Sequence, residues 1–145
     1  MLVLTTEFPH VFLSALGPSG DGTIRIPKRA LEEMQMPEIA ARIRDCRHLY
    51  TFDSGTRVTL HKNVTVGRDA YLLIPSYYAN VSRQHCLLFH SDDHWWIAQC
   101  HNYEPRAITV AQRDGTAIVG KDPVRLKAGD RVRLADSFEF VVAET

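Results

Sequence analysis

The stretch VSRQHCLLFHSDDHWWIAQC, residues 81–100, decides the fold class of this chain. It contains two apolar runs of strand length, residues 85–90 and 95–100, and four polar residues separate them. Serine and aspartate favour turns because their side chains hydrogen-bond to the nearby backbone. Short apolar runs bounded by turn residues are typical of β-strands. The stretch therefore predicts two strands joined by a turn.

The same pattern continues outside this stretch. From residue 48 onward, short apolar runs alternate with turn-forming residues such as Asp53-Ser54-Gly55 and Arg113-Asp114-Gly115. Such alternation is typical of a β-sandwich or a barrel. Ten strands are expected, at residues 48–52, 57–61, 65–67, 72–74, 85–90, 95–100, 107–111, 116–119, 131–134 and 139–143. The sequence predicts an all-β fold of about 10–11 short strands.

The first 46 residues differ in character from the rest. Short strand-like runs come first, and two segments of good helix formers, 29–35 and 38–44, then lie on either side of Pro37. Four apolar residues recur in them at approximately helical spacing, and we expect this stripe to pack on the sandwich: Leu31, Met34, Ile39 and Ile43. The predicted organisation is a partly helical N-terminal extension, residues 1–46, and a sandwich domain, residues 47–145.

Charge and composition exclude several classes of protein. Seventeen basic and seventeen acidic residues cancel, so the chain as a whole lacks the charge of a nucleic-acid-binding protein, and any anion site must be local. No apolar run approaches the roughly 20 residues that cross a bilayer, so no membrane association is expected. Cys46, Cys86 and Cys100 are an odd number without C-x-x-C spacing, which fits reduced thiols. These features predict an intracellular protein.

Sequence motifs of catalysis and metal binding do not stand out. The glycine-rich loop at residues 17–22 lacks the Gly-Lys-Ser/Thr ending of a P-loop. The histidines show neither the helical i, i+4 pair nor the mixed Cys/His spacing of zinc sites. No nucleophile–base motif or kinase signature is recognisable. We therefore expect no enzymatic activity, no metal and no cofactor.

Three short motifs follow one another along the predicted sandwich. Val66-Gly67-Arg68-Asp69 ends a strand, Val81-Ser82-Arg83-Gln84-His85 opens the next one, and Leu126-Lys127-Ala128-Gly129-Asp130 lies near the end. Each motif is common by itself, but their order and spacing are specific. With the Trp-rich strand that follows the second motif, the sequence resembles the forkhead-associated (FHA) domain family over about residues 48–143. The resemblance implies an FHA-like (SMAD/FHA-type) β-sandwich that binds phosphothreonine-containing segments.

The resemblance also assigns roles to single residues. A phosphate monoester carries about −1.5 to −2 charge and three strong acceptor oxygens, so it needs a cation and several donors. Arg68 would supply a guanidinium fork, Ser82 a hydroxyl and Arg83 a second cation; the alternative for Arg68 is an ion pair with Asp69 or another carboxylate. The phosphopeptide-binding set is Arg68, Ser82, Arg83, Asn102 and Arg106. Structural support of the binding loop is expected from Gly67, His85, Gly129 and Asp130.

The sequence departs from the family at one motif. FHA domains usually carry an Asn-Gly-Thr segment after the Trp-type strand, and its Asn fixes the peptide backbone. One alignment register places residues 102–106 there, with Glu104 near the Asn position and Arg106 near the Thr position. A second register uses Asp114-Gly115-Thr116 after an insertion. Both put a carboxylate near the ligand, so the alternative function is a divergent FHA scaffold with phosphate-independent protein interaction or dimerisation.

The resemblance further implies a threonine-phosphorylated protein or peptide as the partner, with no direct contact to nucleic acid. We expect the module to be the regulatory part of a larger kinase or of a DNA-damage or cell-cycle protein, in the nucleus if the organism is eukaryotic. Thr5-Thr6-Glu7-Phe8 leaves two alternatives. It is either an ordinary terminal strand or a flexible segment whose phosphorylation supports self-association of two copies.

Overall fold

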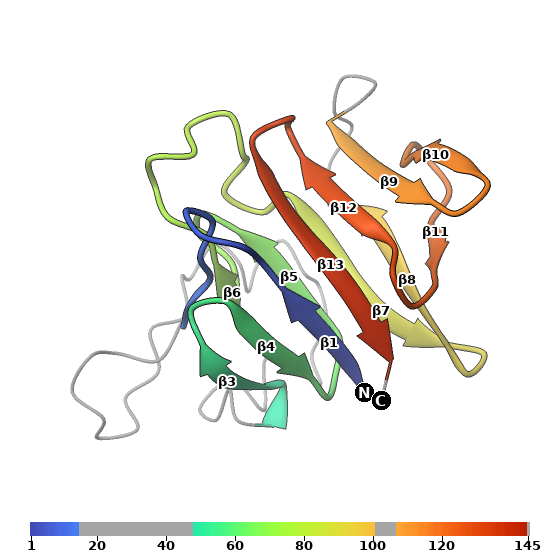
Figure 1. Ribbon diagram of the computed structural model, residues 1–145, viewed down its shortest axis with the longest axis horizontal. Helices are drawn as coiled ribbons and strands as arrows, with labels where there is room; N and C mark the ends of the chain where they lie inside the picture. The colour runs from blue at the N-terminus through green and yellow to red at the C-terminus, as the bar shows by residue number, and fades with distance from the viewer. Residues whose placement is uncertain (15–47, 101–106, 145) are drawn as a thin grey trace.

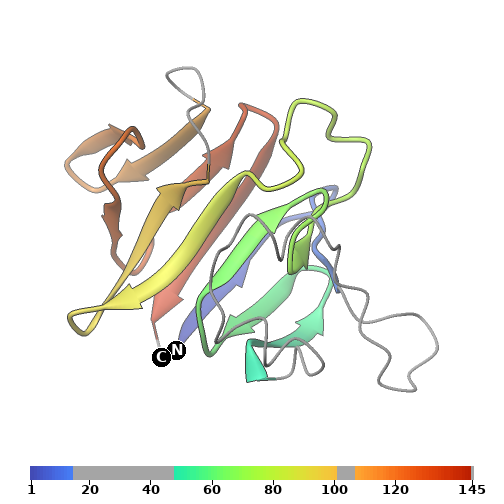
Figure 2. The same ribbon diagram turned by 180° about the vertical axis from the view of Figure 1, so that it is seen from behind.

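Two β-sheets packed face to face form the computed structural model, which describes residues 1–14, 48–100 and 107–144 (Figure 1). One sheet has seven strands in the order β10-β9-β12-β13-β1-β4-β3, and the other has six in the order β11-β8-β7-β5-β6-β2. Figure 2 shows the six-stranded sheet from its own side. The all-β sandwich predicted from the sequence is confirmed.

The strands are short and almost all antiparallel, with β5 and β6 as a parallel pair. Their bounds are β1 (Leu2–Thr5), β2 (Leu13–Ser14), β3 (Tyr50–Ser54), β4 (Arg57–Leu60), β5 (Val64–Gly67), β6 (Leu72–Leu73), β7 (Cys86–Ser91), β8 (His94–Gln99), β9 (Ile108–Gln112), β10 (Gly115–Ile118), β11 (Val124–Leu126), β12 (Arg131–Leu134) and β13 (Phe138–Glu144).

All ten expected strands are present, and each lies within two residues of its predicted bounds. Three further strands, β1, β2 and β11, were not among them. β11 follows Pro123 and has only three residues, which are too few for an alternation of apolar and polar residues to be recognised in the sequence. It forms because its backbone pairs with β8, where Val124 lies opposite Ile97.

β1 is an interior strand of the seven-stranded sheet. It pairs antiparallel with β13 on one side and with β4 on the other, so that Leu2 lies between Glu144 and Leu60. Leu2 and Leu4 are completely buried, and the chain termini lie side by side (Figure 1). The first residues therefore belong to the sandwich. The predicted boundary between residues 46 and 47 and the predicted helices lie outside the described residues.

Hydrogen bonds also hold the two threonines at the end of β1. Thr5 ends β1 opposite Val141, and its hydroxyl donates to the Val141 carbonyl at 3.5 Å. The Thr6 hydroxyl donates to the His10 carbonyl at 2.9 Å. Thr5 is therefore the last residue of an ordinary strand, and Thr6, Glu7 and Phe8 follow it outside the strand.

The space between the sheets is filled by apolar side chains from both. Phe12 packs edge-to-face on Phe138 and Phe140, with ring centroids 5.3 and 5.7 Å apart. Complete burial of such a side chain contributes about 1.5–3 kcal/mol, so this cluster anchors the segment after β1 to β13. Among the described residues, no helix has the length and apolarity of a membrane span.

The loops divide between the two ends of the sandwich. At one end, along the upper edge of Figure 1, the segments after β5 and before β7 lie near the β12–β13 turn. The Ala107 carbonyl accepts hydrogen bonds there from His85 Nε2 and from the Ala135 amide. At the other end, Gln112 donates to Asp130 Oδ2 at 3.1 Å. We call the end that contains Ala107 the Arg68 end, because the predicted phosphate-binding arginine lies there.

Candidate functional site

The site begins with a close backbone approach at Gly67, the last residue of β5. A β-carbon placed on Gly67 would lie 2.2 Å from the Arg83 carbonyl oxygen and 2.8 Å from that of Ser82. The two segments are also joined by hydrogen bonds, from the Arg68 amide to the Ser82 carbonyl at 3.2 Å and from the Asp69 amide to the Arg83 carbonyl at 2.7 Å. The missing side chain at Gly67 therefore lets the β5–β6 segment lie directly against residues 82–83.

Arg68 is held in place by the carbonyl of Val81. Its Nε–H donates to that oxygen, and the side chain is half-buried. Within the described ranges, neither Asp69 nor any other carboxylate forms an ion pair with Arg68, and no hydrogen bond occupies its terminal nitrogens. The guanidinium is therefore oriented through Nε, and its two terminal nitrogens keep four N–H donors toward the described residues for a charge-assisted contact with an anion.

His85 fixes the segment that carries Ser82. The Ser82 amide donates to His85 Nδ1 at 2.9 Å, and the His85 amide donates to the Val66 carbonyl at 2.9 Å. Because Nδ1 accepts, the ring proton lies on Nε2, which donates to the Ala107 carbonyl at 2.8 Å. Burial lowers the pKa of His85, and the hydrogen bond to Ala107 opposes this more weakly. The ring therefore stays neutral and supports the Ser82 loop, as the resemblance implies.

The β12–β13 turn is tied to the same point. The Ala107 carbonyl that accepts from His85 also accepts from the Ala135 amide at 2.7 Å. Ala135 and Asp136 both have φ of 53°, a left-handed conformation that is unfavourable for a residue with a β-carbon. A type I′ turn needs positive φ at both central residues, and the Ser137 amide closes this turn by donating to the Leu134 carbonyl at 3.0 Å. The turn thus holds Ala135 where its amide reaches Ala107.

The structure brings together five of the predicted site residues. Gly67 and Arg68 come from the end of β5, and Ser82, Arg83 and His85 come from the segment that opens β7. Ser82 is half-buried, and Arg83 is exposed with no ion pair to the described residues. The other two predicted ligands, Asn102 and Arg106, lie outside the described residues.

Gly129 and Asp130 do not belong to this group. They form the expected tight turn, in which Gly129 has φ of 91° and Asp130 Oδ2 accepts from the Lys127 amide at 2.8 Å. However, the turn precedes β12, whereas Ala135 follows it at the Arg68 end. Their predicted support of the binding loop is therefore wrong, because the whole length of β12 separates them from it. They stabilise the opposite end.

The placement of Asp114-Gly115-Thr116 excludes the second of the two registers for the missing Asn-Gly-Thr motif. Gly115 opens β10 opposite Gln112, the last residue of β9. Ala107, which precedes β9, contacts His85 at the other end of that strand. The second register therefore puts the motif at the wrong end of the sandwich. The first register, at residues 102–106, lies outside the described residues.

Two groups that build the site were not predicted from the sequence, and both are backbone carbonyls. Val81 orients Arg68 and Ala107 orients His85, each through its carbonyl oxygen. Every residue except proline carries the same main-chain donor and acceptor. Such groups leave no signal in the residue type, so only the fold could reveal them.

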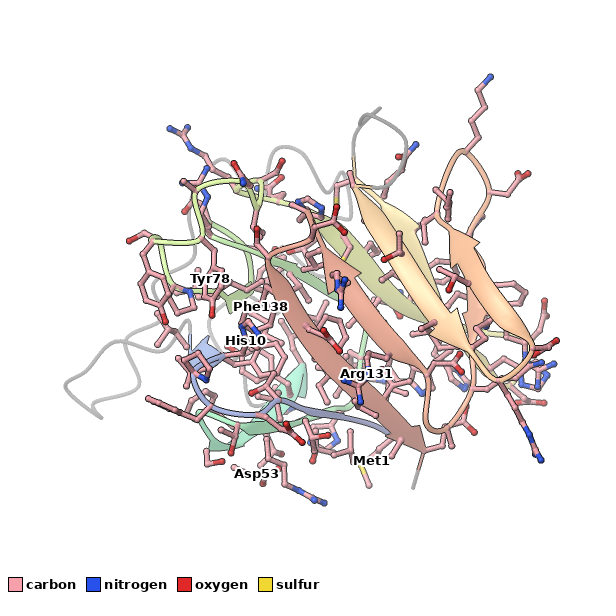
Figure 3. The ribbon with its side chains drawn as sticks, turned by 45° about the horizontal axis from the view of Figure 1, so that its top comes forward. Met1, His10, Asp53, Tyr78, Arg131 and Phe138 are labelled. Atoms are coloured by element: carbon pink, nitrogen blue, oxygen red, sulfur yellow. The ribbon has the colours of Figure 1, made fainter. Side chains whose placement is uncertain are left out.

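A groove of about 270 Å³ lies elsewhere, on the outer face of the seven-stranded sheet. Thr6, His10, Arg131 and Glu139 are among the residues that line it. Arg131 donates to Glu139 at 2.6 Å, and Figure 3 shows Arg131 on β12 in this region. Of the predicted phosphate-binding residues that the structure describes, Arg68, Ser82 and Arg83, none lines the groove.

The FHA domain model matches residues 64–135, from β5 to the residue after β12. No curated protein matches the sequence. Similar solved structures include an FHA domain from a study of phosphothreonine-dependent FHA interactions, at 24% identity and TM-score 0.48, covering 66% of this chain and 92% of that one. The FHA domain of human APLF, in complex with an XRCC1 bisphospho peptide, has 22% identity and TM-score 0.49, covering 67% and 95%.

A third structure is Mycobacterium tuberculosis EmbR in complex with a low affinity phosphopeptide, at 24% identity and TM-score 0.46, covering 65% of this chain and 24% of that one. The matched segment, residues 64–135, contains Gly67, Arg68, Ser82 and His85, whose contacts build the Arg68 end. The chain therefore belongs to the FHA domain family.

Proposed function

We propose that this domain binds threonine-phosphorylated segments of partner proteins at the Arg68 end. The observation that supports the proposal most directly is the orientation and hydrogen bonding of the Arg68 side chain. Its Nε is fixed by the Val81 carbonyl, and its terminal nitrogens donate to none of the residues that the structure describes. A fixed guanidinium fork loses little side-chain entropy when a phosphate binds, so more of the interaction energy appears as affinity.

Ser82 and Arg83 complete the proposed phosphate contact. The Ser82 backbone is held from two sides, by His85 through its amide and by Arg68 through its carbonyl. Its hydroxyl supplies a further donor beside the guanidinium. Arg83 follows directly and is exposed, so it can approach the phosphate or the peptide from solvent. Since the net charge of the chain is zero, affinity for a phosphate depends on this local grouping.

Asn102 and Arg106 are proposed to hold the peptide on either side of the phosphothreonine. FHA domains are interaction modules, and we assign this one no catalytic role. The test for the two residues is to replace each with alanine and to compare the affinity with that of Arg113→Ala, which removes an exposed charge at the opposite end. A loss confined to Asn102→Ala and Arg106→Ala supports the assignment. Equal affinities for all three variants contradict it.

Fluorescence anisotropy tests the function itself. A degenerate phosphothreonine peptide library is titrated beside its phosphoserine and unphosphorylated counterparts, with Arg68→Ala as the site variant and Arg113→Ala as the charge-matched control. We expect binding that requires the phosphate and that falls at least about tenfold in Arg68→Ala, since a charge-assisted contact contributes about 1.5–3 kcal/mol. Equal binding of all three peptide classes would refute phosphate recognition.

The second candidate is a divergent scaffold that binds partners without phosphate. The observation in its favour is that Asp114-Gly115-Thr116 lies at the wrong end to replace the missing Asn-Gly-Thr motif. The same titration separates the two functions. A scaffold binds the unphosphorylated and phosphorylated forms of its partner with the same affinity and is unaffected by Arg68→Ala.

We also propose a cellular setting for the domain. A reader of phosphothreonine acts downstream of a protein kinase, so we place it inside the cell as the regulatory part of a larger kinase or of a DNA-damage or cell-cycle protein. Affinity capture from lysate, with and without prior phosphatase treatment, tests this setting. Partners that disappear after phosphatase treatment, and that include such proteins, support it. A partner set insensitive to phosphatase contradicts it.

A further inference from the structure

A small aromatic cluster joins three distant segments next to the Arg68 end. His10 follows β1, Tyr78 lies in the β6–β7 loop, and Phe138 opens β13. Their ring centroids are 5.6 Å apart for His10 and Tyr78, 5.3 Å for His10 and Phe138, and 5.2 Å for Tyr78 and Phe138. Figure 3 shows the three side chains side by side. Two of them, His10 and Phe138, lie outside the segment that matches the family model.

A short hydrogen bond joins the two polar members. His10 Nδ1 and the Tyr78 hydroxyl are 2.6 Å apart, and the bond forms whichever atom donates. Burial raises the pKa of Tyr78, and the neighbouring Tyr77 adds to this. The hydroxyl therefore keeps its proton across the neutral range, and the contact persists there.

Tyr78 is the anchor of the loop tip. Within residues 76–80, Ser76, Tyr77, Ala79 and Asn80 are exposed, and Tyr78 alone is partly buried. The loop tip contains no β-strand, so no ladder of backbone hydrogen bonds fixes its position. Its conformation depends on how firmly the Tyr78 side chain is held against His10 and Phe138.

From Tyr78 a continuous chain of hydrogen bonds leads to the phosphate-binding arginine. The Tyr78 amide donates to the Pro75 carbonyl at 3.1 Å, and the Val81 amide donates to the Tyr78 carbonyl at 3.0 Å. The Val81 carbonyl then accepts from Arg68 Nε. A displacement of Tyr78 therefore moves the oxygen that orients the guanidinium fork. Displacements of about 1 Å at a positioning group are enough to reduce function strongly.

We propose that His10 and Tyr78 are positioning residues for Arg68, so that the segment after β1 controls the affinity of the phosphate site through the β6–β7 loop. This inference rests on the proposed function, because it takes Arg68 as the phosphate ligand. It assigns a recognition role to a residue from the first turn of the chain after β1, more than fifty positions away from Arg68 in the sequence.

The test follows the NMR signal of the Arg68 side chain in the absence of any ligand. In ¹H–¹⁵N spectra, the Arg68 Nε–H gives its own signal, which is assigned by its loss in Arg68→Lys. We expect this signal to shift or broaden in Tyr78→Phe and in His10→Ala, both of which remove the hydrogen bond. His94→Ala is the control, because His94 opens β8 opposite Ser91, at the other end of β7 from Ser82. The Arg68 signal should stay unchanged in this variant.

Two further readouts separate positioning from simple stabilisation. For a phosphothreonine peptide we expect Tyr78→Phe and His10→Ala to raise Kd by about threefold to tenfold, the size of one lost hydrogen bond. The double variant should lose no more than either single variant, because both break the same contact. Thermal melting reports stability. A lower Tm with an unchanged Arg68 signal and unchanged Kd would overturn the proposal.

Failure of the proposed function gives a different result. If the unmodified domain binds no phosphopeptide, the proposed phosphothreonine binding is refuted. The Arg68 Nε–H signal still tests whether Tyr78 positions Arg68. A shift of that signal in Tyr78→Phe supports the link from Tyr78 to Arg68. An unchanged signal in both Tyr78→Phe and His10→Ala refutes it.

Discussion

At the scale of single residues, Gly67 shows how a missing side chain builds the site. A β-carbon there would lie 2.2 Å from the Arg83 carbonyl oxygen, which is backbone and cannot rotate away. The two loops would have to separate. The same separation would lengthen the hydrogen bond from the Arg68 amide to the Ser82 carbonyl, now 3.2 Å. Stability and phosphate binding therefore depend on this one position together.

Gly67→Ala is predicted to lower the free energy of unfolding by about 2–3 kcal/mol, because the overpacked contact must be relieved by backbone movement. Phosphopeptide affinity should fall with it. Chemical denaturation and a peptide titration measure the two effects. Gly120→Ala is the control, since a β-carbon there meets no atom. A Gly67→Ala variant as stable as the parent protein would show that the two loops are not in close contact.

His85 makes stability depend on pH in a direction fixed by its environment. The folded pKa is lowered from 6.5, mainly by burial, so the unfolded chain binds a proton more readily than the folded one. Stability is therefore complete above about pH 6.5 and falls as the pH drops toward the lowered folded value. Protonation of Nδ1 would also remove the acceptor of the Ser82 amide.

We therefore predict that the free energy of unfolding decreases from pH 7.5 to pH 5, and that His85→Gln removes part of this decrease. An imidazole titration followed by NMR should give a pKa below 6.5 for His85, the ordinary value from which burial lowers it. The idea fails if His85 titrates above its ordinary value or if the variant has the same pH profile as the parent.

At the scale of elements, the two turns beside β12 have separate tasks. The β12–β13 turn places the Ala135 amide on the Ala107 carbonyl at the Arg68 end. The turn before β12 is closed by Asp130, which is 4% exposed and accepts from the Lys127 amide and from Gln112. The two turns are the opposite ends of one strand, so damage to one should leave the other intact.

Asp130→Ala should cost about 1–3 kcal/mol in the free energy of unfolding, because it leaves buried donors without their acceptor. Phosphopeptide Kd should stay within about twofold of the parent, since the substitution lies at the far end of β12. Asp130→Asn, which keeps a carbonyl oxygen, should lose less stability. If Asp130→Ala is fully folded but binds the phosphopeptide much more weakly, this turn does support the binding loop.

The strands of the sandwich and the central residues of the site could be predicted from the sequence. Short apolar runs with clear turn residues predicted ten strands to within two residues, and the spacing of Gly67, Arg68, Ser82 and His85 indicated the loops that meet. The end of the sandwich at which each turn lies could not be predicted from the sequence. Turns with Gly and Asp look alike in sequence, so Asp114-Gly115-Thr116 and Gly129-Asp130 could be placed only through the strand pairing.

The position of β1 could not be predicted for a related reason. The run LVLT is apolar and short, and nothing local says whether it lies at an edge or in the middle of a sheet. Its place between β13 and β4 is set by pairing with residues 57–60 and 141–144. Such non-local pairing is a property of the whole chain rather than of any segment.

At the scale of the whole molecule, β1 makes the N-terminus part of the domain. Leu2, Val3 and Leu4 are buried, each contributing about 1.5–3 kcal/mol by burial. Their sum is comparable to the total stability of a small domain, about 5–15 kcal/mol. Without β1, β13 and β4 would each lose a partner in the sheet.

A chain trimmed to residues 48–145 is therefore predicted to lack a cooperative thermal transition. A matched chain that keeps residues 1–15 and replaces residues 16–46 with a flexible Gly-Ser linker should melt cooperatively. Circular dichroism and calorimetry distinguish the two. Cooperative melting of the trimmed chain would show that residues 48–145 fold alone and that β1 is dispensable.

The measurement that tests the central claim most directly is a titration of the ¹⁵N-labelled domain with a phosphothreonine peptide, followed by the shifts of its amide signals. We predict that the largest shifts fall on Gly67–Asp69 and Ser82–His85, together with Arg68 Nε–H, and that Gly115 and Gly129 at the opposite end stay unchanged. Shifts concentrated on residues 113–116 and 127–130, or identical shifts with the unphosphorylated peptide, would contradict a phosphate site at the Arg68 end.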